Sequence, residues 1–200
     1  MDPAKIWNER FAATEYVYGT NPNDFLVECL SGRRIGCAFS VAEGEGRNAV
    51  WMAEHGAQVH SIDASVKGVE KTLRLAKEHG VTVDAQVGLL EQLQIRESHY
   101  DTIVSVFAHM PRAERALLHN KLVRALKPDG LFVFEAYSPN QPKFDTGGPK
   151  DLDLLVTVDD LRTELAGLNF LVLHEVERNV VEGSLHTGKA SVVQCMGIKR

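Results

Sequence analysis

The clearest chemical pattern in the chain is a pair of glycines followed at a fixed distance by an acid. In the stretch VAEGEGRNAVWMAEHGAQVHSID (41–63), Gly44 and Gly46 stand between a strand-like and a helix-like segment, and Asp63 ends the next strand-like segment. Glycine lets the backbone approach a ligand where a Cβ would clash. An acid about 20 residues beyond such a turn typically binds the ribose hydroxyls of a nucleotide-type cofactor. Since Asp63 follows Gly44 by 63 − 44 = 19 residues, the pattern predicts such a site.

This turn leaves the identity of the cofactor open. Residues 44–49 also satisfy the G-x-G-x-x-G/A fingerprint, so an NAD-binding oxidoreductase is an alternative. Three features disfavour it: the chain has no Tyr-x-x-x-Lys pair, 200 residues leave no room for a second catalytic domain, and an aromatic-rich segment precedes the first strand.

Two histidines are candidates for contact with a substrate. His109 follows a buried strand-like run, where a role at the entry of the next helix would explain it equally well, and His186 lies in the segment SLHTGK near the end of the chain. Imidazole titrates near neutrality, so His186 could orient or deprotonate a substrate, although a surface position would explain it equally well. The remaining histidines show no metal-ligand spacing, and no metal is predicted.

Strand-like and helix-like segments alternate along the chain, which predicts an α/β fold with a doubly wound, mostly parallel sheet of seven strands. The final strand should be antiparallel, because the connection 178–189 has no helical pattern. We expect helices over 6–13, 21–30, 47–56, 65–80, 111–126 and 157–168, and strands over 33–39, 57–62, 81–87, 100–107, 131–137, 169–177 and 190–198.

Cap residues and apolar spacing add detail to three of these helices. Ser65 and Thr157 are expected to cap the helices that follow them, and Asn21 with Pro22 to begin the helix over 21–30. The spacing in 65–80 predicts an inward face made of Val66, Val69, Leu73 and Ala76.

Ligands of such sheets bind beyond the carboxyl ends of the parallel strands. This predicts one rim, formed by 42–46, 63–65, 88–91, 107–111, 138–150 and 178–189. We expect one domain over 1–200, with 1–31 as a helical cover, 32–200 as the α/β core, and the Pro- and Gly-rich loop 138–153 over the site.

Composition restricts the classes of partner. Hydrophobic residues make up 44% and charged residues 24%, and the net charge of −5 gives no basic surface for nucleic acid. No apolar run approaches the roughly 20 residues that span a bilayer, and the first residues have no secretory pattern. The three separated cysteines are typical of reduced thiols. We therefore expect a cytoplasmic protein with a small-molecule substrate and no nucleic-acid or membrane partner; the oligomeric state stays undetermined.

Several stretches together resemble one enzyme family over nearly the whole chain. WNERFAATEYVYGTNPNDFL, AEGEGRNAVWMAEHGAQVHSIDAS, YDTIVSVFAHMP, LKPDGLFVFEAYSP and DTGGPKDLDLL resemble the TehB-like (tellurite-resistance type) branch of class I S-adenosylmethionine-dependent methyltransferases. The glycine loop is generic, whereas EYVYGT, GEGRNA and TGGPKD are more particular to this branch.

The resemblance implies a Rossmann-like methyltransferase fold and S-adenosyl-L-methionine as the cofactor. It places Glu43, Gly44 and Gly46 at the amino-acid and ribose portion of the cofactor, and Asp63 at the ribose hydroxyls. The segment 87–90 would flank the adenine. Val106, Phe107 and His109 would line the methionine side. Tyr16, Tyr18 and Gly19 would belong to an N-terminal cover over the cofactor. The implied set of cofactor-binding residues also includes Asn48, Ala64, Gly88 and Leu89.

The implied activity is methyl transfer to a small soft nucleophile, a tellurium or selenium oxyanion or a thiol. Such a displacement depends mainly on positioning the reactants. The sequence departs from the family at Ser40, Ala42 and Gly88, where an acid, a glycine and an acid are common. These departures leave a further alternative, a non-catalytic module that binds S-adenosylmethionine or S-adenosylhomocysteine.

Overall fold

Seven strands alternate with helices along the chain. The computed structural model describes residues 2–144, 146–183 and 185–200. The strands are β1 (Cys37–Val41), β2 (Gln58–Asp63), β3 (Val83–Val87), β4 (Tyr100–Val106), β5 (Leu126–Tyr137), β6 (Leu168–Val181) and β7 (Thr187–Lys199). The helices are α1 (Pro3–Arg10), α2 (Asp24–Leu30), α3 (Arg47–Glu54), α4 (Val66–Glu78), α5 (Arg112–Ala125) and α6 (Val158–Glu164), with single 3₁₀ turns η1 (Leu90–Gln92), η2 (Gln141–Lys143) and η3 (Leu152–Leu154).

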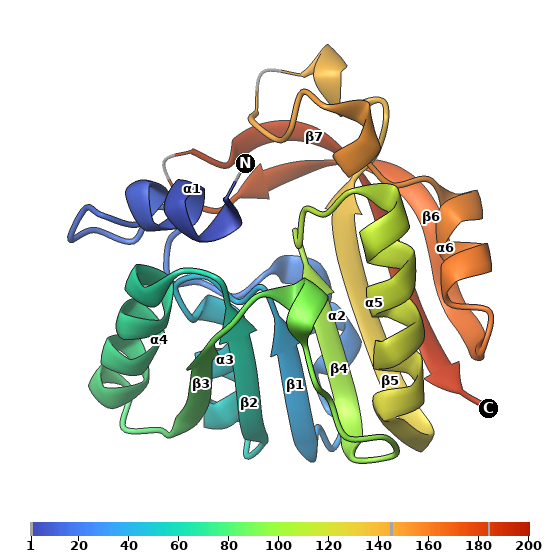
Figure 1. Ribbon diagram of the computed structural model, residues 1–200, viewed down its shortest axis with the longest axis horizontal. Helices are drawn as coiled ribbons and strands as arrows, with labels where there is room; N and C mark the ends of the chain where they lie inside the picture. Colours follow the sequence, from blue (N-terminus) through green and yellow to red (C-terminus); the bar gives the residue numbers. More distant parts are fainter. Residues whose placement is uncertain (1, 145, 184) are drawn as a thin grey trace.

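The strands form one sheet in the order β3-β2-β1-β4-β5-β7-β6 (Figure 1). Strands β1 to β5 pair in parallel, and β7 pairs antiparallel with both β5 and β6. This topology confirms the predicted doubly wound, mostly parallel sheet of seven strands with an antiparallel final strand.

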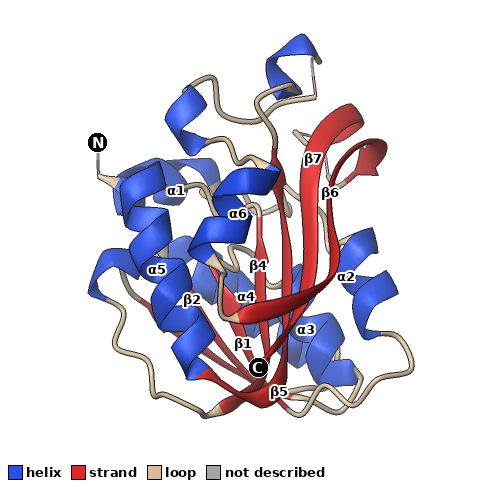
Figure 2. Cartoon of the chain, turned by 90° about the vertical axis from the view of Figure 1, so that its right-hand side faces the viewer, coloured by secondary structure: helices blue, strands red, loops and turns tan. Residues whose placement is uncertain are grey.

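Helices cover both faces of the sheet (Figure 2). On one face α5 and α6 bury apolar residues such as Leu122 and Leu161 against Ile103 and Phe132. On the other face α2, α3 and α4 form a second apolar layer over β1 to β4. Burial of strands on both faces explains their nearly continuous apolar sequence.

The predicted caps of two helices are confirmed, whereas other local predictions are wrong. Ser65 caps α4, and Thr157 forms a reciprocal capping box with Asp160 at the start of α6. Helix α2 begins later than predicted, because the side chain of Asn23, not Asn21, accepts the hydrogen bond from Leu26 N.

The predicted inward face of α4 is only half correct. Val69 and Ala76 are buried, but Val66 and Leu73 are 46% and 47% exposed. Gly68, Thr72 and Leu75 are buried in their place, because α4 also packs against the glycine loop and α1.

The last two strands are longer than predicted. Their pairing continues to Val181 opposite Thr187, so most of the predicted connection 178–189 is strand. Hydrogen bonds between the two strands keep the pair together beyond the sheet's edge, and this brings the hairpin tip above the carboxyl ends of the parallel strands (Figure 1). Among the described residues, no helix is both long and apolar enough to cross a membrane.

Candidate functional site

The carboxyl ends of β1 to β5 form one edge of the sheet, and the predicted rim lies along it. The glycine loop 42–46 follows β1, Asp63 ends β2 and Ala64 follows it, Gly88 and Leu89 follow β3, and Val106 ends β4. The strand order reverses between β1 and β4. Open α/β sheets bind their ligands at such a reversal.

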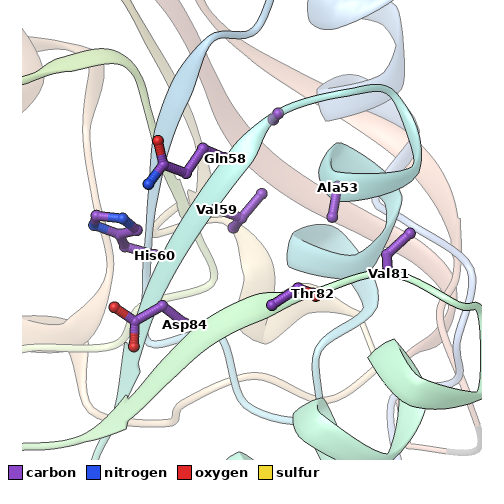
Figure 3. A pocket seen from close by; sticks show the side chains of 8 residues that line it. Ala53, Gln58, Val59, His60, Val81, Thr82 and Asp84 are labelled. Carbon is purple, nitrogen blue, oxygen red and sulfur yellow. The ribbon is translucent and has the colours of Figure 1, made fainter.

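A separate cleft lies at the opposite edge, at the amino ends of β2 and β3 (Figure 3). It has a volume of about 440 Å³ and contains none of the predicted site residues. Its lining comprises Ala53, Ala57, Gln58, Val59, His60, Val81, Thr82 and Asp84.

Backbone strain marks the point where the strand order reverses. Ala42, just after β1, has φ 49°, and Phe107, just after β4, has φ 54°. A side chain in this left-handed region costs about 1–3 kcal/mol, and such residues gather at functional sites. Two of them at the ends of the two central strands point to this position as the ligand site.

The glycine loop and Asp63 are joined directly. Gly44 has φ 67°, and its N–H donates to the Asp63 carboxylate at 2.8 Å. The other carboxylate oxygen accepts the N–H of Ser65 at 2.8 Å. Burial raises the pKa of Asp63, and these two hydrogen bonds oppose that rise. Each carboxylate oxygen keeps a lone pair with which to accept a ligand hydroxyl.

Two predicted ligand residues face into the protein instead of the rim. Glu43 accepts the N–H groups of Asn48 and Ala49, each at 2.9 Å, and the hydroxyl of Ser40. It thereby caps α3, whose N-cap residue is a glycine. Asn48 accepts the N–H of Asn23 at 2.9 Å. Both residues support the loop from beneath.

Aromatic side chains from four segments meet beside the loop. We call Tyr18, Phe107, His109, Tyr137 and His186 the aromatic cluster. The rings of Phe107 and Tyr137 lie 4.5 and 5.2 Å from that of His186, measured between centroids. Tyr18 meets His186 at 5.9 Å, and His109 stacks on Tyr137 at 5.9 Å.

Three polar atoms in the aromatic cluster are buried without a hydrogen-bond partner among the described residues. They are His109 Nδ1, the Tyr137 hydroxyl and His186 Nε2. Burial, with His186 nearby, lowers the pKa of His109 to about 4, and burial raises the pKa of Tyr137. His109 and Tyr137 are therefore neutral at pH 7. Buried polar atoms without partners are rare, and a bound ligand would supply the partners missing here.

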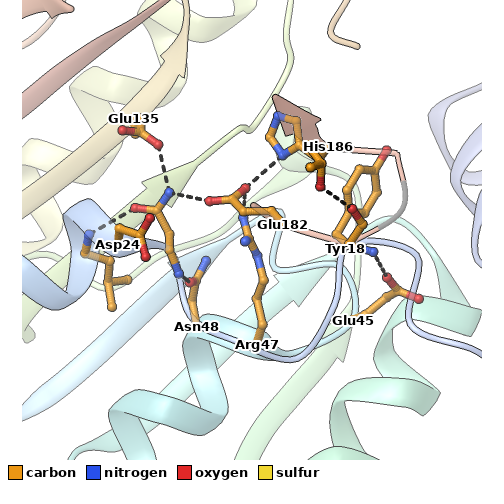
Figure 4. A network of polar contacts seen from close by, with 12 residues as sticks. Tyr18, Asp24, Glu45, Arg47, Asn48, Glu135, Glu182 and His186 are labelled. Carbon is orange, nitrogen blue, oxygen red and sulfur yellow. Dashed lines mark hydrogen bonds and ion pairs between the residues drawn. The ribbon is translucent and has the colours of Figure 1, made fainter. Parts of the chain in front are cut away.

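An ionised carboxylate holds His186 in place (Figure 4). His186 Nδ1 lies 2.8 Å from Glu182, whose carboxylate also accepts from Arg47 at 2.7 Å and from Asn23 at 2.8 Å. Burial alone would raise the pKa of Glu182, but the hydrogen bond from His186 and the charge and hydrogen bond of Arg47 lower it well below its ordinary value. Glu182 therefore accepts the Nδ1 proton and directs the Nε2 lone pair into the aromatic cluster.

A second buried carboxylate extends this network into the sheet. Glu135 on β5 is fully buried, forms an ion pair with Arg178 on β6, and accepts from Asn23 at 2.7 Å and from Gln194 at 2.6 Å. The network fixes the hairpin, and with it His186, relative to the parallel strands.

The segment that precedes β1, here called the lead segment (residues 2–31), closes over the glycine loop. Phe11 is 3% exposed, and a Cβ at Gly44 would lie 3.3 Å from its ring. Tyr18 and Gly19 press against the hairpin turn, where a Cβ at Gly183 would lie 2.2 Å from the Val17 carbonyl oxygen. Phe11 and Tyr18, 6.2 Å apart, thus connect the glycine loop with the aromatic cluster.

The loop 138–153 packs on the aromatic cluster from the other side. A Cβ at Gly148 would lie 2.7 Å from the Tyr137 ring, and one at Gly147 would lie 2.9 Å from the Leu185 carbonyl oxygen. The glycines of the TGGPKD motif therefore permit close contact between this loop, Tyr137 and the hairpin.

Sequence reasoning missed four residues of this site. Tyr137 ends a predicted strand at the rim, so the strand-end rule could have found it. Arg47, whose Nη1 is buried without a partner in the described part of the chain, directly follows the glycine loop. Glu45 binds the N–H groups of the lead segment and pairs with a lysine of α4. Glu182 carried no sequence signal.

Known structures share this fold. A protein from work on the conversion of a disulfide bond into a thioacetal group during echinomycin biosynthesis matches with a TM-score of 0.78 and 16% identity, over 98% of this chain and 89% of that one. TehB from Haemophilus influenzae matches with a TM-score of 0.71 and 14% identity, over 99% and 67% of the two chains. Magnesium protoporphyrin IX methyltransferase from Synechocystis PCC 6803, solved with bound SAM, matches with a TM-score of 0.68 and 16% identity, over 100% and 98%.

A family model adds a functional class to the fold. Residues 38–130, which include the glycine loop and Asp63, match the model described as a methyltransferase domain. This match confirms the predicted methyltransferase and agrees with S-adenosyl-L-methionine as its cofactor. A search of curated proteins found no match.

Proposed function

We propose that this methyltransferase domain moves the methyl group of S-adenosyl-L-methionine to a small soft nucleophile, a tellurium or selenium oxyanion or a thiol. One observation carries the proposal: three buried polar atoms that have no partner among the described residues belong to the aromatic cluster, at the carboxyl edge of the sheet. The acceptor class rests on the resemblance of EYVYGT, GEGRNA and TGGPKD to the TehB-like branch. The close spacing of the rings supports an acceptor of only a few atoms.

The residues around the glycine loop fit the cofactor. Asp63 would accept its ribose hydroxyls, with Ala64, Gly88 and Leu89 beside the adenine. The buried Arg47 Nη1, which has no partner within the described ranges, would bind its carboxylate. Val106 and Phe107 would line the methionine side.

The proposal gives the flanking segments a role as covers within one domain, 1–200. Residues 1–31, through Phe11, Tyr18 and Gly19, would close over the cofactor, and 138–153 would close over the acceptor. The remaining residues of 32–200 form the α/β core. Exclusion of water by such covers strengthens the electrostatic interactions inside.

The protein's own groups would position the acceptor and receive its proton. When bound, the cofactor supplies a methyl group on a positively charged sulfur, and transfer leaves the bonding electrons on that sulfur. Aromatic faces such as those of Tyr18 and Phe107 favour a cation nearby. His186 Nε2 would take the proton of a neutral nucleophile while Glu182 holds the ring, and His109 and Tyr137 would hydrogen-bond the acceptor.

Calorimetric titration followed by turnover tests this function. S-adenosylhomocysteine should bind and NAD should not; the reverse result would favour the oxidoreductase. Labelled cofactor is then supplied with tellurite, selenite and a panel of thiols. If the chain binds S-adenosylhomocysteine but transfers no labelled methyl group to any of these acceptors, the result would favour a non-catalytic cofactor-binding module.

A matched pair of variants tests the role of His186. His186→Gln should slow transfer to a protonated thiol by about 10²-fold or more, the range for loss of a general base, and should affect an ionised oxyanion less. His55→Gln, at an exposed histidine stacked on Trp51, is the control and should leave both rates unchanged. Equal rates for wild type and His186→Gln on the thiol would rule out the base.

A further inference from the structure

Three metal-ligating side chains converge at the amino edge of the sheet, away from the methyltransferase site. They are Cys37 at the start of β1, His60 on β2 and His99 just before β4. One ligand atom from each lies within 4.8 Å of the other two. Cys37 Sγ lies 4.0 Å from His99 Nε2, and the rings of His60 and His99 lie 6.2 Å apart.

We propose that Cys37, His60 and His99 form a binding site for a borderline-soft transition-metal ion, with Zn²⁺ as the ion that fits best. A thiolate and two imidazoles are ligands that zinc prefers, with Zn–S near 2.3 Å and Zn–N near 2.0–2.1 Å. Tetrahedral angles at those lengths require ligand atoms about 3.3–3.6 Å apart. The three side chains are half-buried, so small rotations about their side-chain bonds can bring them this close.

Neighbouring groups already orient the ring of one ligand and anchor the backbone of another. The hydroxyl of Tyr100 lies 3.3 Å from His60 Nδ1, which leaves Nε2 of that ring to bind the metal. The N–H of Cys37 donates at 2.8 Å to Asp101, which forms an ion pair with Lys127 at 2.9 Å. Such outer partners fix the orientation of metal ligands.

The cleft of Figure 3 provides the fourth coordination position. His60 belongs both to the group of three metal-ligating side chains and to the lining of the cleft. Asp84 on β3 pairs in register with His60, and Figure 3 shows its carboxylate on the same side of the strands as the imidazole. Either this carboxylate or a water molecule from the cleft would complete the tetrahedron. Three protein ligands and one exchangeable position form a site that can also bind a small anion.

Metal titration of the untagged full chain tests the site independently of methyl transfer. After treatment with a chelator, the chain should bind one equivalent of Zn²⁺, and Co²⁺ in its place should give a thiolate-to-metal charge-transfer band. Saturation at about 100 times the dissociation constant should raise the melting temperature by roughly 5–10 °C. Absence of stoichiometric binding would overturn the proposal.

Single variants assign the ligands. Cys37→Ser should abolish the charge-transfer band, and His99→Gln should weaken binding by more than the roughly 10- to 100-fold lost with an outer partner. Cys29→Ala, at a buried cysteine outside the cluster, is the control and should keep both the band and the affinity. Retention of the band in Cys37→Ser, or of full affinity in His99→Gln, would refute this ligand set.

Discussion

Replacing Tyr137 by phenylalanine should make the protein more stable and the enzyme less active. The side chain is 1% exposed, and its hydroxyl has no hydrogen-bond partner among the described residues. A buried polar group without a partner costs about 1–3 kcal/mol. Phenylalanine keeps the ring and its packing and leaves only a small void. We therefore expect Tyr137→Phe to raise the free energy of unfolding by about 1–2 kcal/mol.

Equilibrium unfolding in urea measures this change in the absence of ligands. A gain of this size moves the melting temperature up by roughly 2–4 °C per kcal/mol in a chain of this length. Tyr100→Phe is the matched control, because the buried Tyr100 hydroxyl lies 3.3 Å from His60 Nδ1. Removing that hydrogen bond should lower stability by about 0.5–1.5 kcal/mol.

The same variant should lose part of its activity. If the Tyr137 hydroxyl binds the methyl acceptor, its removal should lower kcat/KM by roughly 2- to 10-fold, the value of one hydrogen bond. A Tyr137→Phe protein that is less stable than the wild type would show that the hydroxyl has a partner in the folded chain. A more stable variant with full activity would remove Tyr137 from the acceptor site.

Further variants test the surrounding groups. Glu182→Gln should lower kcat by about 10-fold or more, because the carboxylate positions His186, and should also change the KM for the cofactor, because the carboxylate pairs with Arg47 at 2.7 Å; an unchanged kcat would argue against the positioning role. Burial lowers the pKa of His109 to about 4 in the folded chain, from near 6.5 in the unfolded chain. The unfolded chain therefore takes up the proton first, and the free energy of unfolding falls as the pH drops from 6.5 towards 4. In urea unfolding from pH 7 to 4.5, the wild type should lose about 2–3 kcal/mol more than His109→Gln, and equal losses would contradict the burial argument. Gly148→Ala places a Cβ 2.7 Å from the Tyr137 ring at φ 92° and should destabilise by about 1–3 kcal/mol, measured by the same unfolding; an unchanged midpoint would mean that the loop moves away from Tyr137.

Local patterns predicted the elements of this fold well. Alternating apolar strands and amphipathic helices predicted the doubly wound sheet, and the lack of a helix before the last strand predicted the antiparallel end. Ser65 and Thr157 were recognisable as caps because a cap depends only on residues two or three positions away. The rule for strand ends brought the glycine loop, Asp63 and the β4 end to one edge.

Side-chain directions were beyond the sequence because packing decides them. Glu43 turns inward to cap α3, and Val66 and Leu73 of α4 face solvent although their spacing is that of a buried stripe. Glu43 binds backbone N–H groups of α3 that its glycine N-cap leaves without a side-chain partner. The buried face of α4 is set by its packing against the glycine loop and α1. Neither kind of contact appears in the local sequence pattern.

The sequence by itself determined the class of fold, the edge of the sheet at which we expect a ligand and the residue types available there. Only the tertiary structure decided which of them meet: Glu182 with His186, Tyr137 with His109, and, at the other edge, Cys37 with His60 and His99. Each of the last three comes from a different strand or loop, so no spacing along the chain could reveal the group. Strand order and register bring them within a few ångströms, and these follow from burying both faces of the whole sheet at once.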